Sequence, residues 1–181
     1  MELRNSKTKF LNSKRPGHLI GPLFYIWEAY IIMKVKVLFS YPCTPFGEII
    51  EAVEGKGQPS HAAIFMLGGI LEALSNGFVK SPINAYDQFK HTIIEVDVPN
   101  IEAAEEEANK LLGNPYGYRA CLDGGLHDLL GVTVPGDGEK TVDCSEAVTR
   151  ILRAGGVDVL PGVYADCVTP ADLLKELQPF V

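Results

Sequence analysis

One cysteine of the chain stands where a helix should begin. Residues 141–148 read Thr-Val-Asp-Cys-Ser-Glu-Ala-Val, and Asp143 is of a type that caps helix N-termini. Cys144 would then lie in the first helical turn, where backbone N–H groups and the helix dipole favour a thiolate over a thiol. The pattern is typical of a nucleophilic cysteine, and the alternative interpretation is a small buried apolar side chain.

A histidine and a glutamate elsewhere in the chain could complete such a site. His61 begins an apolar run directly after a loop rich in glycine and proline, and Glu72 is an acid inside the next apolar run. A nucleophilic cysteine needs a base that removes its proton and later protonates the leaving group, and a polar group that fixes the tautomer of that base. The alternatives are a hydrogen-bonded histidine at a strand end and an outward-facing strand carboxylate.

The pairing register of the two runs decides which residue can orient His61. A two-residue turn at Gly68-Gly69 would set His61 opposite Asn76 and leave Glu72 out of reach. A four-residue loop over residues 66–69 would place Glu72 diagonal to His61, at a Cβ separation of ~6–8 Å that a glutamate can bridge. We favour the second register and keep Asn76 as the alternative orienting residue.

Both strands and helices are predicted among the elements that must position these residues. Apolar patterns and turn residues predict strands at Val35–Phe39, His61–Leu67, Ile70–Ser75 and Thr92–Val98, and helices at Phe46–Val53, Glu102–Leu112, Cys144–Ala154 and Pro170–Leu177. Thr169 caps the last helix, residues 116–130 hold a short helix, and residues 131–140 form a loop. This order predicts an α+β fold with an antiparallel sheet packed against helices.

Composition limits the function classes. A chain of 181 residues that is 46% hydrophobic can bury the core of one domain without disulfides or metal. The net charge is −7 overall, +3 over residues 1–32 and −10 over the remainder. An acidic body repels phosphate, which excludes nucleic acid as a partner.

Cysteine spacing argues against a metal site. The four cysteines are separated by 78, 23 and 23 positions, which matches no zinc or redox pattern. We therefore expect reduced thiols, no metal and no cofactor, and we place the protein in the cytoplasm, with the cell envelope as the alternative.

The N-terminal part of the sequence differs from the rest. A basic stretch precedes an apolar run over residues 19–27, which is followed by Glu28 and then by apolar residues 29–33. The apolar segment of about 14 residues is shorter than the ~20 that span a bilayer, and the small-residue cleavage site of a signal peptide is lacking. We expect an extension over residues 1–32, with weak membrane-surface contact through residues 19–27, and the functional domain over residues 33–181.

Together, the motifs resemble the circularly permuted branch of the NlpC-type papain-like superfamily, in which the histidine strand precedes the cysteine helix. The resemblance covers about Val35–Leu177 and rests on five segments: Ser60-His61-Ala62-Ala63-Ile64, Leu71-Glu72-Ala73, Gly113-Asn114-Pro115-Tyr116-Gly117-Tyr118, Asp143-Cys144-Ser145-Glu146 and Val168-Thr169-Pro170-Ala171-Asp172-Leu173.

The resemblance implies a role for each site residue. Cys144 is the nucleophile, His61 the general base and acid, and Glu72 the residue that orients His61. Tyr116, with Tyr118 as the fallback, lines the site and supplies an oxyanion or substrate hydrogen bond or simply packs there. The backbone N–H of Cys144 is one oxyanion donor.

The implied activity is that of a cysteine peptidase or amidase. The thiolate attacks an amide carbonyl of a small peptide, of the cell-wall type, and forms a thioester acyl-enzyme. Two alternatives remain open: an acyltransferase or lipid acyl hydrolase of the same fold, and a catalytically silent binding module.

Overall fold

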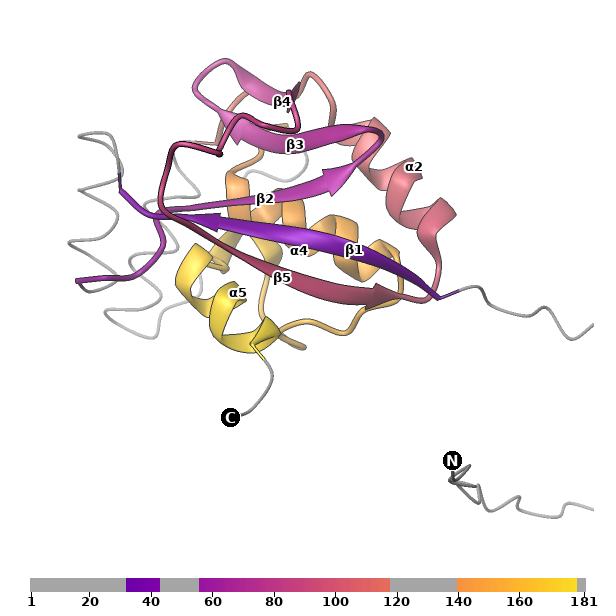
Figure 1. Cartoon of the computed structure of the whole chain (residues 1–181). Helices are drawn as coiled ribbons and strands as arrows, with labels where there is room; N and C mark the ends of the chain where they lie inside the picture. Colours follow the sequence, from indigo (N-terminus) through magenta and orange to yellow (C-terminus); the bar gives the residue numbers. More distant parts are fainter. Residues whose placement is uncertain (1–31, 43–55, 118–139, 179–181) are drawn as a thin grey trace, which may run out of the picture.

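The computed structural model of the chain describes residues 32–42, 56–117 and 140–178 (Figure 1). These residues form the strands β1 (Met33–Ser40), β2 (His61–Met66), β3 (Gly69–Leu74), β4 (Gly77–Ser81) and β5 (His91–Val98), the helices α2 (Ile101–Leu111), α4 (Cys144–Ala154) and α5 (Pro170–Leu177), and the short 3-10 helix η1 (Ala165–Cys167). The helix predicted at residues 46–53 lies outside the described residues, as do nearly all of residues 116–130 and of the 131–140 loop.

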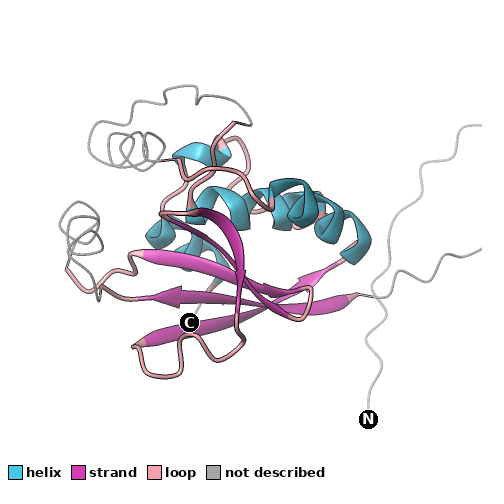
Figure 2. Ribbon diagram, turned by 90° about the horizontal axis from the view of Figure 1, so that it is seen from above, coloured by secondary structure: helices cyan, strands magenta, loops and turns pink. Residues whose placement is uncertain are grey.

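The five strands form one antiparallel sheet in the order β4-β3-β2-β1-β5. The described helices lie on one face of this sheet (Figure 2). The predicted α+β class, with an antiparallel sheet packed against helices, is therefore confirmed. The ends of α4 and α5 also agree with the sequence, since local caps and hydrophobic spacing fix both.

Alternation along the strands divides the buried side chains into two groups. The larger group faces the helices and includes Val37 of β1, Ile64 of β2 and Ile151 of α4. The smaller group lies on the other face, which we call the outer face, and contains Leu38, Ala63 and Ile70. Residues 82–90 connect β4 to β5, which are the two edges of the sheet, and this crossover packs on the outer face through Ala85 and Tyr86.

The turn between β2 and β3 consists of Leu67 and Gly68, so it is shorter than the favoured loop over residues 66–69 and lies one residue before the alternative Gly68-Gly69 turn. Leu67 and Gly68 both have positive φ values, 53° and 74°, as a type I′ hairpin turn requires. Gly69 instead pairs with Met66 in the ladder. A Cβ on Gly69 would lie 2.9 Å from the carbonyl oxygen of Ser81, so this glycine permits the close approach of β4 and is not a turn residue.

Strand β4 was not predicted. It is a five-residue edge strand that pairs only with β3 among the described strands, and its sequence, Gly-Phe-Val-Lys-Ser, shows little alternation. The observed order therefore has four strands, not three, between residues 61 and 98. Short edge strands take their identity from pairing with a neighbour, which sequence spacing does not reveal.

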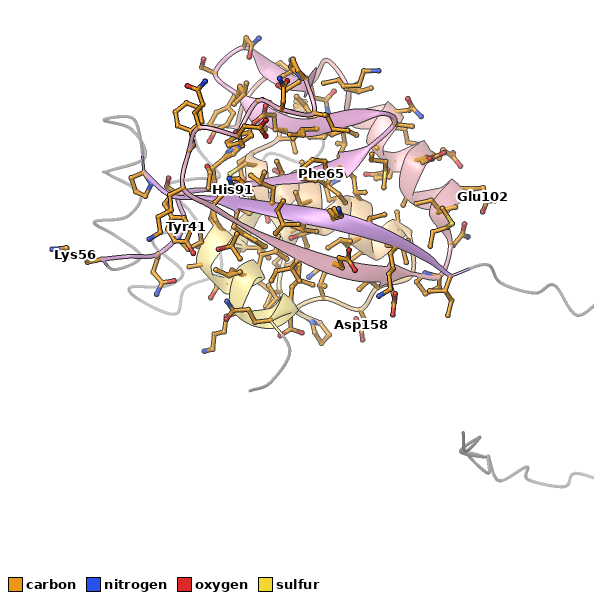
Figure 3. All side chains as sticks on the ribbon, in the orientation of Figure 1. Tyr41, Lys56, Phe65, His91, Glu102 and Asp158 are labelled. Atoms are coloured by element: carbon orange, nitrogen blue, oxygen red, sulfur yellow. The ribbon has the colours of Figure 1, made fainter. Side chains whose placement is uncertain are left out.

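Helix α4 packs on the sheet with its C-terminal end near the end of β5 (Figure 1). A Cβ added to Gly155, just after α4, would meet Val98 at the last position of β5. The N-terminus of α4 therefore lies toward the opposite end, where β5 begins with His91 and where Ser40 pairs with both His91 and His61. Figure 3 shows Tyr41 and His91 at this end of the sheet, which we call the His61 end.

A partly buried ion pair joins α4 to α2. Arg150 donates from Nη2 and Nε to the same carboxylate oxygen of Glu107, at 2.7 and 3.0 Å. Its contact to Glu146 is longer, at 3.5 Å. This pair links α4 to α2 through side chains that are each 17% exposed.

None of the helices described here is long and apolar enough to cross a bilayer. The predicted membrane-surface segment at residues 19–27 lies outside the described part of the chain.

Candidate functional site

Asp143 builds the start of helix α4 as predicted. Its carboxylate accepts from the backbone N–H of Glu146 at 2.8 Å and from the Ser145 hydroxyl at 3.1 Å, while Glu146 accepts from the Asp143 backbone N–H at 3.3 Å. These contacts form a capping box. Cys144 is the first helical residue and is only 3% exposed, so its thiol lies at the positive end of the helix dipole.

The two carboxyl groups of the capping box are unusually weak acids. Burial raises the pKa of Asp143 to about 7, although hydrogen bonds from Glu146 and Ser145 oppose this rise. Burial and the nearby Asp143 raise the pKa of Glu146 to about 8. The 3.5 Å contact from Arg150 to Glu146 does not offset the burial, because Arg150 lies closer to Glu107. At pH 7 Asp143 is about half protonated and Glu146 is mostly protonated, so the negative charge beside Cys144 is smaller than two ionised carboxylates would give.

The Pro-Tyr-Gly segment lies against the start of α4. Tyr116 forms a parallel bridge with Val142, and backbone hydrogen bonds of 3.0 Å join Gly117 and Pro115 to Val142. A Cβ on Gly117 would lie 3.4 Å from the backbone nitrogen of Asp143. Tyr116 is half-buried and packs against the core that includes Cys144, whereas Tyr118 lies outside the described residues.

His61 and Glu72 are in direct contact. The imidazole Nε2 lies 2.9 Å from the carboxylate Oε2, and the side chains are 15% and 2% exposed, respectively. The ladder pairs Ile64 with Leu71, so one further step along the same register sets Glu72 opposite Ala63 and diagonal to His61. This is the register favoured from the sequence, reached through a shorter turn than the four-residue loop we expected.

Asn76 does not take the orienting position. It lies in the exposed two-residue turn between β3 and β4, and the imidazole nitrogen that it would have contacted is bonded to Glu72. The reason is the register: β2 and β3 are joined by a turn at residues 67–68, and the Gly68-Gly69 turn that would set His61 opposite Asn76 does not form.

Glu72 is held by several donors besides His61. The Tyr86 hydroxyl donates to the same oxygen, Oε2, and the Ser81 side chain is also hydrogen-bonded to the carboxylate. Burial raises the pKa of Glu72, but the hydrogen bonds from His61, Ser81 and Tyr86 outweigh this effect and hold the pKa below its ordinary value. The carboxylate is therefore charged at neutral pH and bonded to the imidazole.

Tyr86 is the site residue that sequence reasoning missed. Its ring stacks on the His61 ring with a centroid separation of 6.0 Å and an interplanar angle of 15°. It lies on the 82–90 crossover, in a stretch without strand or helix periodicity. In the sequence, Tyr86 is an aromatic residue between Asn84 and Asp87, two residues that are common in turns. This pattern indicates a turn but does not indicate what the ring contacts.

Cys144 and His61 share one end of the sheet but belong to different faces. Cys144 lies in the core between sheet and helices, while His61 stacks on Tyr86 of the outer-face cluster. His61 is the first residue of β2, so its ring lies beside the sheet end toward which α4 begins. A contact between the Cys144 thiol and the His61 imidazole would therefore have to form at this end of the sheet. It would involve Nδ1 of the imidazole, because Nε2 is bonded to Glu72.

Within residues 32–42, 56–117 and 140–178, no group of three or more histidine, cysteine or acidic side chains is arranged to hold a metal ion. Cys144 and Cys167, the two cysteines in these ranges, are both buried thiols. Cys43 and Cys121 lie outside them.

Comparisons with known proteins do not assign a family. No protein-family model matches the chain, and no curated protein matches it.

Proposed function

We propose that the protein is a cysteine hydrolase of the peptidase or amidase type, with the circularly permuted NlpC-type papain-like fold. Cys144 is the nucleophile, His61 is the general base and acid, and Glu72 orients His61. The observation that carries this proposal is the buried His61–Glu72 pair, with 2.9 Å between Nε2 and Oε2, at the end of the sheet toward which the Cys144 helix begins.

The direction of the hydrogen bond between His61 and Glu72 determines the chemistry. A charged Glu72 accepts the Nε2 proton, which leaves Nδ1 of the neutral imidazole as the acceptor for the thiol proton. The thiolate sulfur bonds to the carbonyl carbon of an amide, the C–N bond breaks, and the imidazolium returns its proton to the leaving amine. Water then cleaves the thioester, which releases the acid and restores the thiol.

Other parts of the site are consistent with acyl transfer. The backbone N–H of Cys144 at the helix start is an oxyanion donor, and Tyr116 lies beside it through the Val142 bridge. We assign Tyr116 to the lining of the substrate site. The family resemblance suggests a small peptide or acyl group as the substrate, and the acidic chain makes nucleic acid a poor partner.

The experiment that tests the proposal traps the acyl-enzyme. Wild type and the Cys144→Ala variant are incubated with muropeptides, simple peptides and acyl lipids, and the intact mass and the modified residue are read by mass spectrometry. We expect a peptide-derived acyl adduct on Cys144 in wild type and in Cys167→Ala, and no adduct in Cys144→Ala. Cys167→Ala is the matched control, because Cys167 is equally buried but does not begin an α-helix.

Other outcomes have defined meanings. Adducts from acyl lipids alone would assign the acyltransferase or lipid hydrolase activity instead. If no substrate acylates Cys144, and iodoacetamide at neutral pH labels Cys144 no faster than Cys167, the catalytic role of Cys144 is refuted.

A further inference from the structure

The 82–90 crossover brings a third side chain onto the His61–Glu72 pair. Tyr86 contacts both members, since its hydroxyl donates to Glu72 Oε2 and its ring stacks on the imidazole at 6.0 Å. The oxygen that it binds is the same one that accepts from His61 Nε2. Tyr86 therefore acts on the atom that would fix the tautomer of the base.

The crossover that carries Tyr86 is anchored independently of the site. Ala85 packs with Tyr86 on the outer-face cluster, backbone hydrogen bonds within residues 82–89 hold successive turns, and Phe89 contacts the Tyr86 ring edge to face at 6.2 Å. A ring packed in this way presents its hydroxyl at a fixed place, so Glu72 does not need its own rotamer preference to stay aimed at His61.

We propose that Tyr86 is a positioning residue of the cysteine hydrolase site, which locks Glu72 Oε2 onto His61 Nε2 and so holds the imidazole with its proton on Nε2 and its lone pair on Nδ1. This inference rests on the proposed function. The tautomer matters because only a bare Nδ1 can accept the Cys144 proton at the sheet end. Without the Tyr86 hydroxyl, His61 and Ser81 would be the remaining side-chain donors to Glu72, and the carboxylate could rotate toward Ser81.

The test removes only the Tyr86 hydroxyl. In Tyr86→Phe the ring and its stacking remain, and Tyr164→Phe is the matched control because Tyr164 is 59% exposed. The neutral tautomer of His61 is read by nitrogen-15 NMR, and the rate at which iodoacetamide alkylates Cys144 is followed from pH 5 to pH 9. We expect a single Nε2–H tautomer in wild type and in Tyr164→Phe. In Tyr86→Phe we expect a mixture of tautomers and a ~3- to 10-fold slower alkylation at neutral pH, because a hydrogen bond to a charged group is lost.

Two results separate the inference from the function on which it rests. If His61→Ala slows the alkylation of Cys144 but Tyr86→Phe matches wild type in tautomer and rate, the role of Tyr86 is overturned and the hydrolase proposal stands. If His61→Ala leaves the alkylation unchanged, the hydrolase proposal is overturned, and the tautomer measurement, which does not involve Cys144, still decides whether Tyr86 positions the pair. Far-UV circular dichroism of each variant confirms that it folds.

Discussion

The buried acid at the start of α4 should make the stability of the protein depend on pH. Asp143 has a pKa of about 7 in the folded chain against an ordinary value of 3.8, because it is fully buried. The folded state thus binds more protons than the unfolded state between these two values. Stability from this group is fully present below about pH 4 and is lost as the pH rises through 7.

The size of the effect follows from the same values. A tenfold change in a protonation equilibrium is worth ~1.4 kcal/mol, so the whole difference for Asp143 amounts to about 4 kcal/mol. About 2–3 kcal/mol of this contribution to the free energy of unfolding is lost between pH 5 and pH 8. Glu146, with a pKa of about 8, adds a loss of the same sign over an overlapping range.

The variant Asp143→Asn removes this contribution, together with the part of the Glu146 shift that the Asp143 charge causes, which has the same sign. Asparagine keeps an oxygen that accepts from Glu146 and Ser145 and is a good N-cap, but it cannot ionise. Urea unfolding followed by far-UV circular dichroism should show that the stability of the variant relative to wild type increases by about 2–3 kcal/mol from pH 5 to pH 8. The control Asp97→Asn removes an exposed carboxylate, 62% accessible, and should leave the slope unchanged.

One result would refute this reasoning. If Asp143→Asn and wild type give parallel curves of unfolding free energy against pH, Asp143 ionises in the folded state as easily as in the unfolded one. The neutral surroundings inferred for the Cys144 thiol would then be wrong.

Three further outcomes follow from single contacts. Glu72→Gln should lower the acylation rate of Cys144 by ~10²-fold or more, because a neutral amide does not stabilise the His61 imidazolium as the carboxylate does. The rate is measured by mass spectrometry of samples quenched at successive times. Gly69→Ala should lower the urea midpoint by the equivalent of about 1–3 kcal/mol, since its Cβ would meet the Ser81 carbonyl. Arg150→Met should cost about 1–3 kcal/mol in the same assay by leaving partly buried Glu107 without its ion-pair partner, and a loss near zero would show that this pair does not hold α4.

The sequence predicted the features that depend on neighbours along the chain. The N-cap at Asp143, the bounds of α4 and α5, and the strand that begins at His61 all follow from side chains within a few positions of each other. The same local information placed Cys144 in the first turn of its helix, because a cap and an amphipathic run specify a helix start without reference to the rest of the fold.

Tertiary structure decided the contacts between distant segments. Pairing between β2 and β3, with Leu67 and Gly68 as the turn, selects Glu72 over Asn76 as the partner of His61. The turn is shorter than the favoured loop over residues 66–69, because Gly69, which looks like a turn residue, pairs with Met66 and permits the approach of β4. Sequence spacing alone allowed either register.

The same is true of Tyr86 and of the faces of the sheet. Tyr86 reaches Glu72 because the crossover between the two edge strands passes over the outer face, which depends on the strand order. That order also places His61 on the outer face and Cys144 on the helix face, with only the sheet end in common. Residue types and local spacing thus specified which groups could do chemistry, but strand order and register, which are set by long-range pairing and burial, decided which of them meet.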